Sequence, residues 1–140
     1  MHANNIFLSI SLLLFVFHTS FLGALTLLAS DFNKQFSCQN PFTATETTTV
    51  ILNEDILIEG ICELIKAGTG FNVASDRIIF SSSTGNRVLV TQGSTWEIGL
   101  ITQFTGNAHL EKKPGASIYL KNGTTLFMSG NSKYITIPLT

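Results

Sequence analysis

The second half of the chain alternates apolar and polar residues in short runs, each opened by a glycine or an asparagine. The opening residues are Gly85, Gly93, Gly106, Gly115, Gly123 and Asn131. They recur every 8 or 9 residues, except between Gly93 and Gly106, where we interpret residues 100–105 as an insertion. A regular unit of one strand and one corner predicts a repeat protein.

The alternation within each run is typical of a strand with one buried face. Val88 and Val90 fall on one face, and Leu126 and Met128 fall on one face of a later strand. Leu89 points the other way and is also apolar, so we expect the outward face to be partly covered. Corners opened by Gly or Asn need positive φ, which these residues adopt at the least cost.

The region before this repeat continues the same pattern of short strands and turns. Residues 47–52 are rich in β-branched side chains, and strands are also predicted at 56–59, 61–65 and 77–80. Strands this short must stack or pair with others, so an antiparallel sandwich is the alternative to a solenoid. No ten-residue segment after residue 31 has a helical apolar stripe. We therefore predict an all-β domain over 47–140, preceded by an irregular lead-in at 30–46.

Two stretches of this domain resemble a known group of proteins. Residues 47–56, and more clearly 113–126, are similar to coils of the single-stranded right-handed parallel β-helix proteins of the pectin-lyase-like superfamily. The resemblance covers residues 47–138 and implies a parallel β-helix of about three to four coils. It also implies the right hand of the helix. Such proteins include polysaccharide lyases and hydrolases, adhesins and surface proteins, so the resemblance does not select a function.

The first 30 residues contain no charged side chain, and residues 6–28 are almost continuously apolar. We interpret residues 1–29 as a hydrophobic helix that serves as a secretory signal peptide, with Ala24 or Ala29 before the cleavage site. The alternative is an uncleaved anchor, because residues 6–28 would span a hydrocarbon core of about 30 Å. Both readings predict export: a secreted, periplasmic or cell-surface protein in one case, and membrane attachment through residues 6–28 in the other.

The rest of the chain is ordinary in composition. The formal net charge is −1, with 8 Lys and Arg against 9 Asp and Glu, and no basic stripe is present. A nucleic-acid partner is therefore not expected.

Cys38 and Cys62 are the two cysteines of the chain. Their spacing corresponds to three repeat units, so a regular coil would place them one layer apart, within reach of a disulfide. Such a bond needs an oxidising compartment and so agrees with export. The alternative is a pair of buried free thiols.

Residues suited to catalysis do not converge in the sequence. Asp31, Asp55 and Asp76 are widely separated, and Glu59 with Glu63 is better explained as a solvated corner pair than as the two carboxylates of a glycosidase. His109 lacks a neighbouring ligand, so a surface role is favoured over a metal site. We expect no enzyme activity, no catalytic residues, no metal and no cofactor.

Three aromatic residues, Trp96, Tyr119 and Tyr134, are candidates for stacking on sugars if they are exposed on a solenoid face. Packing in the core or between coils is the alternative for each ring. Asn122 begins an Asn-Gly-Thr glycosylation sequon, which matters in a host that glycosylates such sites.

Three classes of function remain. The first, which we favour, is an exported non-catalytic β-solenoid that acts as a cell-surface, adhesion or scaffold element with a glycan or surface partner. The second is a fragment of a carbohydrate-binding or polysaccharide-degrading β-helix protein, and the third is a membrane-anchored stub. Residues 134–137 read as a full strand close to Thr140, so we also expect either self-association through the C-terminal coil or a chain that is a shortened version of a longer repeat array.

Overall fold

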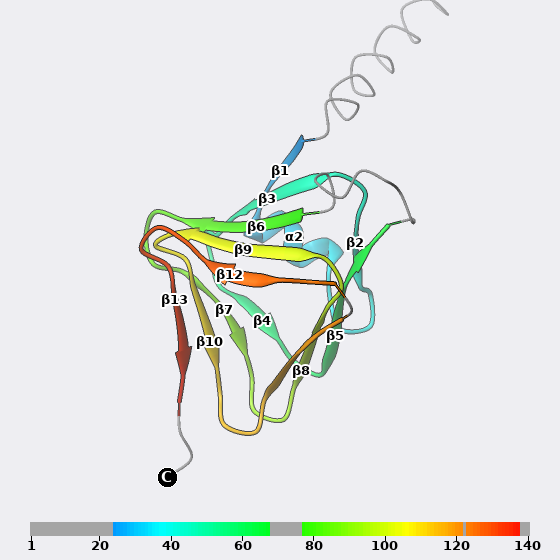
Figure 1. Ribbon diagram of the computed structural model, residues 1–140, viewed down its shortest axis with the longest axis vertical. Coiled ribbons are helices and arrows are strands. Elements are labelled where there is room, and N and C mark those ends of the chain that lie inside the picture. The colour runs from blue at the N-terminus through cyan, green and yellow to red at the C-terminus, as the bar shows by residue number, and fades with distance from the viewer. Residues whose placement is uncertain (1–23, 68–76, 122, 138–140) are drawn as a thin grey trace, which may run out of the picture.

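The computed structural model describes residues 24–67, 77–121 and 123–137. The strands in these ranges form three parallel sheets (Figure 1). The first sheet contains β1 (Ala24–Leu28), β3 (Thr47–Ile51), β6 (Arg77–Ser82), β9 (Ile101–Gly106) and β12 (Leu126–Met128). The second contains β4 (Ile56–Ile58), β7 (Arg87–Val90), β10 (His109–Lys112) and β13 (Lys133–Thr136). The third contains β2 (Phe42–Ala44), β5 (Ile61–Lys66), β8 (Thr95–Ile98) and β11 (Ser117–Leu120).

Every strand pair is parallel, and consecutive strands along the chain lie in different sheets. The chain therefore winds as a parallel β-solenoid of about four coils. This confirms the predicted all-β solenoid and excludes the antiparallel sandwich, because hairpin pairing of consecutive strands does not occur among the described strands.

The core is built from side chains that stack in register from coil to coil. In the first sheet, Val50 lies over Phe80, Phe80 over Phe104, and Phe104 over Met128. The first three of these residues are buried. Each strand adds one layer to a column of apolar side chains, so neighbouring coils bury one another.

The interpretation of residues 100–105 as an insertion was wrong. Strand β9 occupies this stretch, with Thr102 and Phe104 facing the core. The register shows instead that the coil between β3 and β6 is the longer one. The step from Thr48 to its partner Ile78 spans more residues than the step from Ile78 to its partner Thr102. The longer step contains residues 68–76, which lie outside the described part of the chain.

The five predicted corner glycines all have positive φ, but the last corner differs from the prediction. Gly130 has φ of 62° there, and no non-glycine residue in the described ranges has positive φ, so Asn131 is not the left-handed residue. The corner begins one residue earlier than the sequence indicated.

Gly106 illustrates why a side chain is excluded at one of these corners. Its φ is 65°, and an added Cβ would lie 2.6 Å from the backbone oxygen of Ser82. We expect Gly106→Ala to lower the free energy of unfolding by about 2 kcal/mol, combining left-handed strain with this clash. Gly93→Ala is the matched control, because Gly93 has φ of 77° and open space around its Cβ position. Urea denaturation would contradict this argument if Gly93→Ala were the more damaging change.

The segment at 30–46, expected to be irregular, contains helix α2 (Ala29–Gln35) and strand β2. Ala29 and Phe32 of the helix are buried, and the Phe32 ring contacts Phe36, Phe42 and Phe80. The helix lies behind β6 and β9 in Figure 1 and covers the first coil. The helix has seven residues, which is too short to give the ten-residue apolar stripe expected of a helix.

The predicted leader lies mostly outside the described residues, which begin at Ala24, and the Asn122 sequon residue also lies outside them. No helix within the described ranges is long and apolar enough to span a membrane. Residues 24–28, assigned to the leader, form β1 and pair with β3.

This pairing leads to a prediction about processing. Cleavage after Ala29 would remove β1 and leave the edge of β3 unpaired, whereas cleavage after Ala24 would keep most of the strand. If the leader is removed, we therefore expect the mature protein to begin at Leu25 rather than at Ser30. Intact-mass measurement of the exported protein checks this, and a mass that corresponds to residues 30–140 would contradict it.

Candidate functional site

The three aromatic candidates for sugar stacking lie in three different environments. Trp96 is 1% exposed and pairs in register with Cys62 and Ile118 on the inner face of the third sheet. Its ring contacts Phe80 and Phe104 edge-on. Trp96 is therefore a core residue, and the prediction that it is an exposed stacking aromatic was wrong. It lies two residues before buried Ile98 on the same strand, so both side chains face inward.

Tyr119 and Tyr134 are both exposed, at 57% and 46%, but they lie on different sheets. Tyr119 pairs with Glu97 and points outward from the third sheet. Tyr134 pairs with Leu110, which is buried, so it occupies an inward position of the last coil. The two rings do not form one aromatic ladder.

Tyr134 belongs to a group of inward residues that the solenoid leaves partly uncovered. We call this group the open end; it consists of Ile118, Leu120, Leu126, Met128 and Tyr134. Leu120 continues the column of buried Ile98 and yet is 41% exposed. Strands β11, β12 and β13 are the outermost strands of the three sheets on this side, so no described strand pairs with their outer edges.

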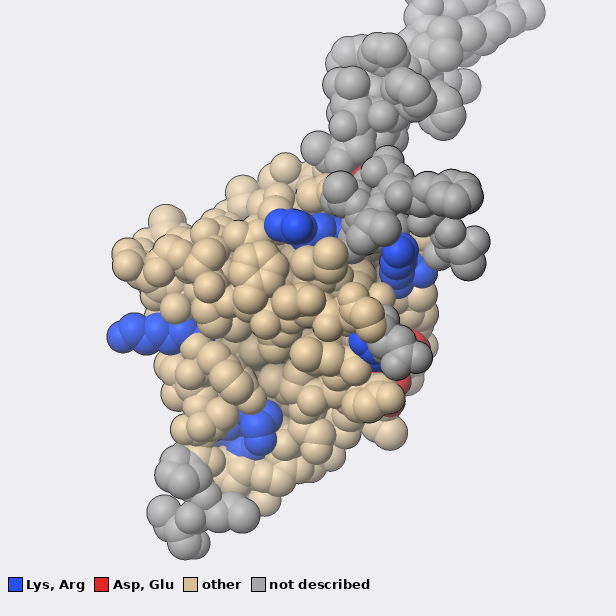
Figure 2. Space-filling view, in the orientation of Figure 1, with Lys and Arg blue, Asp and Glu red and all other residues tan. Residues whose placement is uncertain are grey.

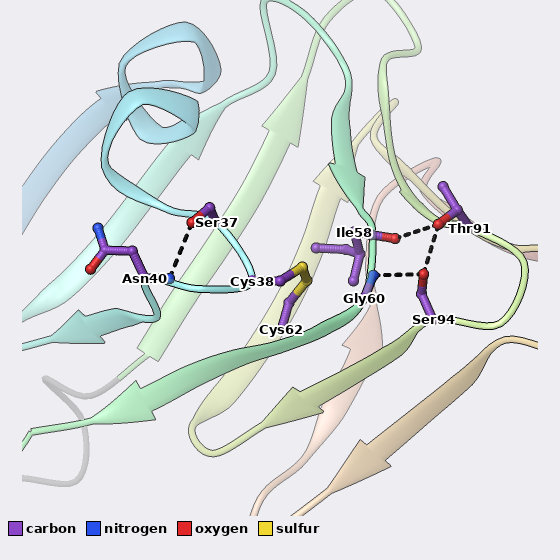
Figure 3. The surroundings of a disulfide bond; sticks show 8 residues. All are labelled: Ser37, Cys38, Asn40, Ile58, Gly60, Cys62, Thr91 and Ser94. Atoms are coloured by element: carbon purple, nitrogen blue, oxygen red, sulfur yellow. Dashed lines mark hydrogen bonds between the residues drawn. A yellow bond between two sulfur atoms is a disulfide. The ribbon is translucent and has the colours of Figure 1, made fainter.

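A disulfide joins Cys38 to Cys62, with their Cα atoms 4.0 Å apart (Figure 3). Cys62 is fully buried in β5, while Cys38 lies in the loop between α2 and β2. Backbone hydrogen bonds in both directions between Ser37 and Asn40 fold this loop into a tight turn. The bond therefore fastens the segment that covers the first coil to the body of the solenoid.

A hydrogen-bonded network beside the disulfide connects two corners (Figure 3). The Thr91 hydroxyl donates to the Ile58 carbonyl at 2.8 Å and lies 2.7 Å from the Ser94 hydroxyl. The backbone N–H of Gly60 donates to Ser94 Oγ at 2.8 Å. The corner between β4 and β5 is thus held against the corner between β7 and β8, one coil further on.

Charged residues on the outer faces form short ladders across coils. Arg87 bonds Asp55 at 3.2 Å and Glu111 at 2.6 Å, and Lys113 lies 3.3 Å from Glu111. Burial of Glu111 acts to raise its pKa, but hydrogen bonds from Arg87 and Lys113 outweigh it, so the pKa of Glu111 lies below its ordinary value. The hydrogen bond to Glu111 raises the pKa of Arg87.

This ladder makes a prediction about acid stability. Because the pKa of Glu111 is lower in the fold than in the unfolded chain, its contribution is complete above about pH 4.5 and is lost as the pH falls through the folded value. We expect Glu111→Gln to flatten the loss of unfolding free energy between neutral pH and pH 3. Asp31→Asn, at an exposed carboxylate that pairs with Lys34, is the matched control. Equal acid slopes for Glu111→Gln and the unmodified protein would contradict the assignment.

Glu63, which the sequence placed with Glu59 in a solvated corner pair, forms an ion pair in the structure. Its carboxylate bonds Lys121, whose ammonium also lies 3.8 Å from Glu97. Within the described ranges no three metal-binding side chains converge. Figure 2 shows Lys and Arg on one face as separate patches rather than a continuous stripe. Arg87 and Lys121 pair with carboxylates of neighbouring coils.

No protein-family model, no curated protein and no solved structure matches the chain.

Proposed function

We propose that this protein is an exported, non-catalytic β-solenoid that acts as a cell-surface, adhesion or scaffold element and associates through its open end. Membership of the pectin-lyase-like superfamily is part of this proposal and is supported by the residue pattern of 47–56 and 113–126. The Cys38–Cys62 disulfide supports export, because such bonds persist mainly in oxidising compartments.

The observation that carries the proposal is the difference between the two ends of the solenoid. At the amino-terminal side, α2 and the cluster of Phe32, Phe36 and Phe42 cover the core. At the other side, the open end exposes apolar side chains that continue buried columns. Unpaired strand edges next to apolar side chains favour pairing with another chain.

Two tyrosines allow a matched test of association. We expect the full chain to associate with increasing concentration and Tyr134→Lys to shift it to monomer, because the charge would enter the contact. Tyr119→Lys is the control, since Tyr119 is at least as exposed but points outward. Sedimentation velocity on the three proteins checks this. A monomeric unmodified protein at high concentration, or equal loss of association in both variants, would exclude the open end as the contact.

Carbohydrate binding is the second candidate, and the exposure of Tyr119 favours it. An exposed tyrosine ring on a flat strand face can stack on a sugar ring. Titration with soluble polysaccharides, monitored by tyrosine fluorescence, tests the idea with Tyr119→Ala as the variant. Unchanged binding in Tyr119→Ala would remove Tyr119 from this role.

A further inference from the structure

A polar groove with a volume of about 700 Å³ crosses three stacked corners of the solenoid. It is lined by residues 83–85 of the first corner, Asn107 and His109 of the second, and residues 130–133 of the third. These corners join β6 to β7, β9 to β10 and β12 to β13, and they lie one beside another on the left of Figure 1. The groove is separate from the open end and from Tyr119.

The corner between β6 and β7 is longer than the two corners that follow it in the groove. Residues 83–86 separate β6 from β7, and residues 129–132 separate β12 from β13. In register, the step from Phe104 to His109 equals the step from Met128 to Lys133, whereas the step from Phe80 to Arg87 is longer. The longer first corner supplies Ser83, Thr84 and Gly85 to the lining of the groove.

The groove favours a negatively charged ligand. Lys133 lines it and is exposed, and no Asp or Glu is among the described residues of the lining. The carboxylates nearest in register are already paired: Asp55 and Glu111 both bond Arg87. The ammonium of Lys133 is therefore not balanced by a carboxylate of the lining.

His109 adds a second group suited to an oxyanion. It pairs in register with Arg87 on one side and Lys133 on the other, so the ring lies in a column of basic side chains. Its Nδ1 is buried and has no hydrogen-bond partner in the described part of the chain. Because Nδ1 is buried, Nε2 is the ring nitrogen that a ligand in the groove would contact.

Polar groups of the lining complete the arrangement. Asn131 and Ser83 are exposed, and Asn107 Nδ2 donates to the Ser83 carbonyl at 3.3 Å. Short amide and hydroxyl side chains around one lysine are the donors that phosphate and sulfate oxygens accept from. The volume also admits a sugar-sized group beside the anion.

We propose that this groove binds a phosphate or sulfate group, either as the free ion or as a monoester carried by a small polar molecule. Lys133 supplies the charge, and His109 and Asn131 supply hydrogen bonds. The site is independent of the association proposed above, since the side chains of the open end do not line it.

Nuclear magnetic resonance titration of the purified full chain tests the site. The probes are inorganic phosphate, inorganic sulfate, glucose 6-phosphate and glucose 6-sulfate, with glucose as the neutral control. We expect saturable amide shifts confined to residues 83–85, 107–109 and 130–133. Tighter binding of the esters than of the free ions would identify a sugar-borne group, and equal binding would identify the free ion; either result supports the site.

Matched variants separate a built site from general attraction to lysines. We expect Lys133→Met to weaken phosphate binding about tenfold, as loss of a charge-assisted hydrogen bond predicts, and His109→Gln to weaken it severalfold. Lys34→Met is the control, because Lys34 is exposed on α2 and away from the groove. Unchanged melting temperatures would show that the variants remain folded. No saturable shifts, or equal weakening by Lys34→Met and Lys133→Met, would overturn the proposal.

Discussion

Phe80→Ala is expected to lower the free energy of unfolding by about 4 kcal/mol. Phe80 is almost fully buried at the centre of an aromatic cluster, where it stacks on Phe104 and meets Phe32 and Trp96 edge-on. Truncation removes the buried ring and leaves a cavity in the middle of a stacked column, where neighbouring coils cannot close it without losing strand register. Urea denaturation of the full chain measures the change.

Phe127→Ala is the control for this experiment. Phe127 points outward from β12, is only partly buried and lies 5.8 Å from the guanidinium of Arg77. Its removal should cost about 1 kcal/mol, since little buried area is lost. If Phe127→Ala were as destabilising as Phe80→Ala, the aromatic cluster would not be the main source of core stability.

The same cluster connects the amino-terminal helix to the coils. Because the Phe32 ring of α2 packs on Phe80, a cavity at Phe80 should also loosen the helix. Hydrogen exchange should then become faster at α2 in Phe80→Ala than in Phe127→Ala.

The period of the chain predicted the solenoid because each coil repeats the same physical requirements. Corners with positive φ select glycine, and inward strand positions select apolar side chains, so Gly115 and Val88 could be assigned from the pattern. Strand β9 was missed because the corner before it contains Gly99, which is required for close backbone packing and not for positive φ. Gly99 is not left-handed; a Cβ there would lie 2.8 Å from the Leu64 carbonyl oxygen. Close approach of two backbones leaves no local signal in the sequence.

The candidate site was less predictable than the fold. The parity of Trp96 with Ile98 indicated an inward ring, and this signal was available in the sequence. The groove at His109 was not predictable, because it depends on three corners that lie far apart along the chain. A lone histidine has no neighbours in sequence that reveal a basic column across coils. Only the register brings Arg87, His109 and Lys133 together.

Cysteine spacing indicated the disulfide, but the geometry that permits the bond is irregular. Phe42 of β2 pairs with Leu64, a shorter step than the separation of 24 residues between Cys38 and Cys62. Cys38 is therefore not a regular strand position above Cys62. The turn between Ser37 and Asn40 takes up the difference and returns Cys38 toward β5.

Loss of this disulfide is expected to lower the free energy of unfolding by about 3.5 kcal/mol, the chain-entropy value for a loop of this length. We expect this effect in the double variant Cys38→Ala/Cys62→Ala, measured by urea denaturation of the full chain. The reduced form of the unmodified protein is the matched control, because it opens the loop but keeps both side chains. If reduction left the unfolding midpoint unchanged while the double variant lost stability, the loss would come from the cavity at fully buried Cys62 and not from the cross-link. The cross-link predicts a large loss in both.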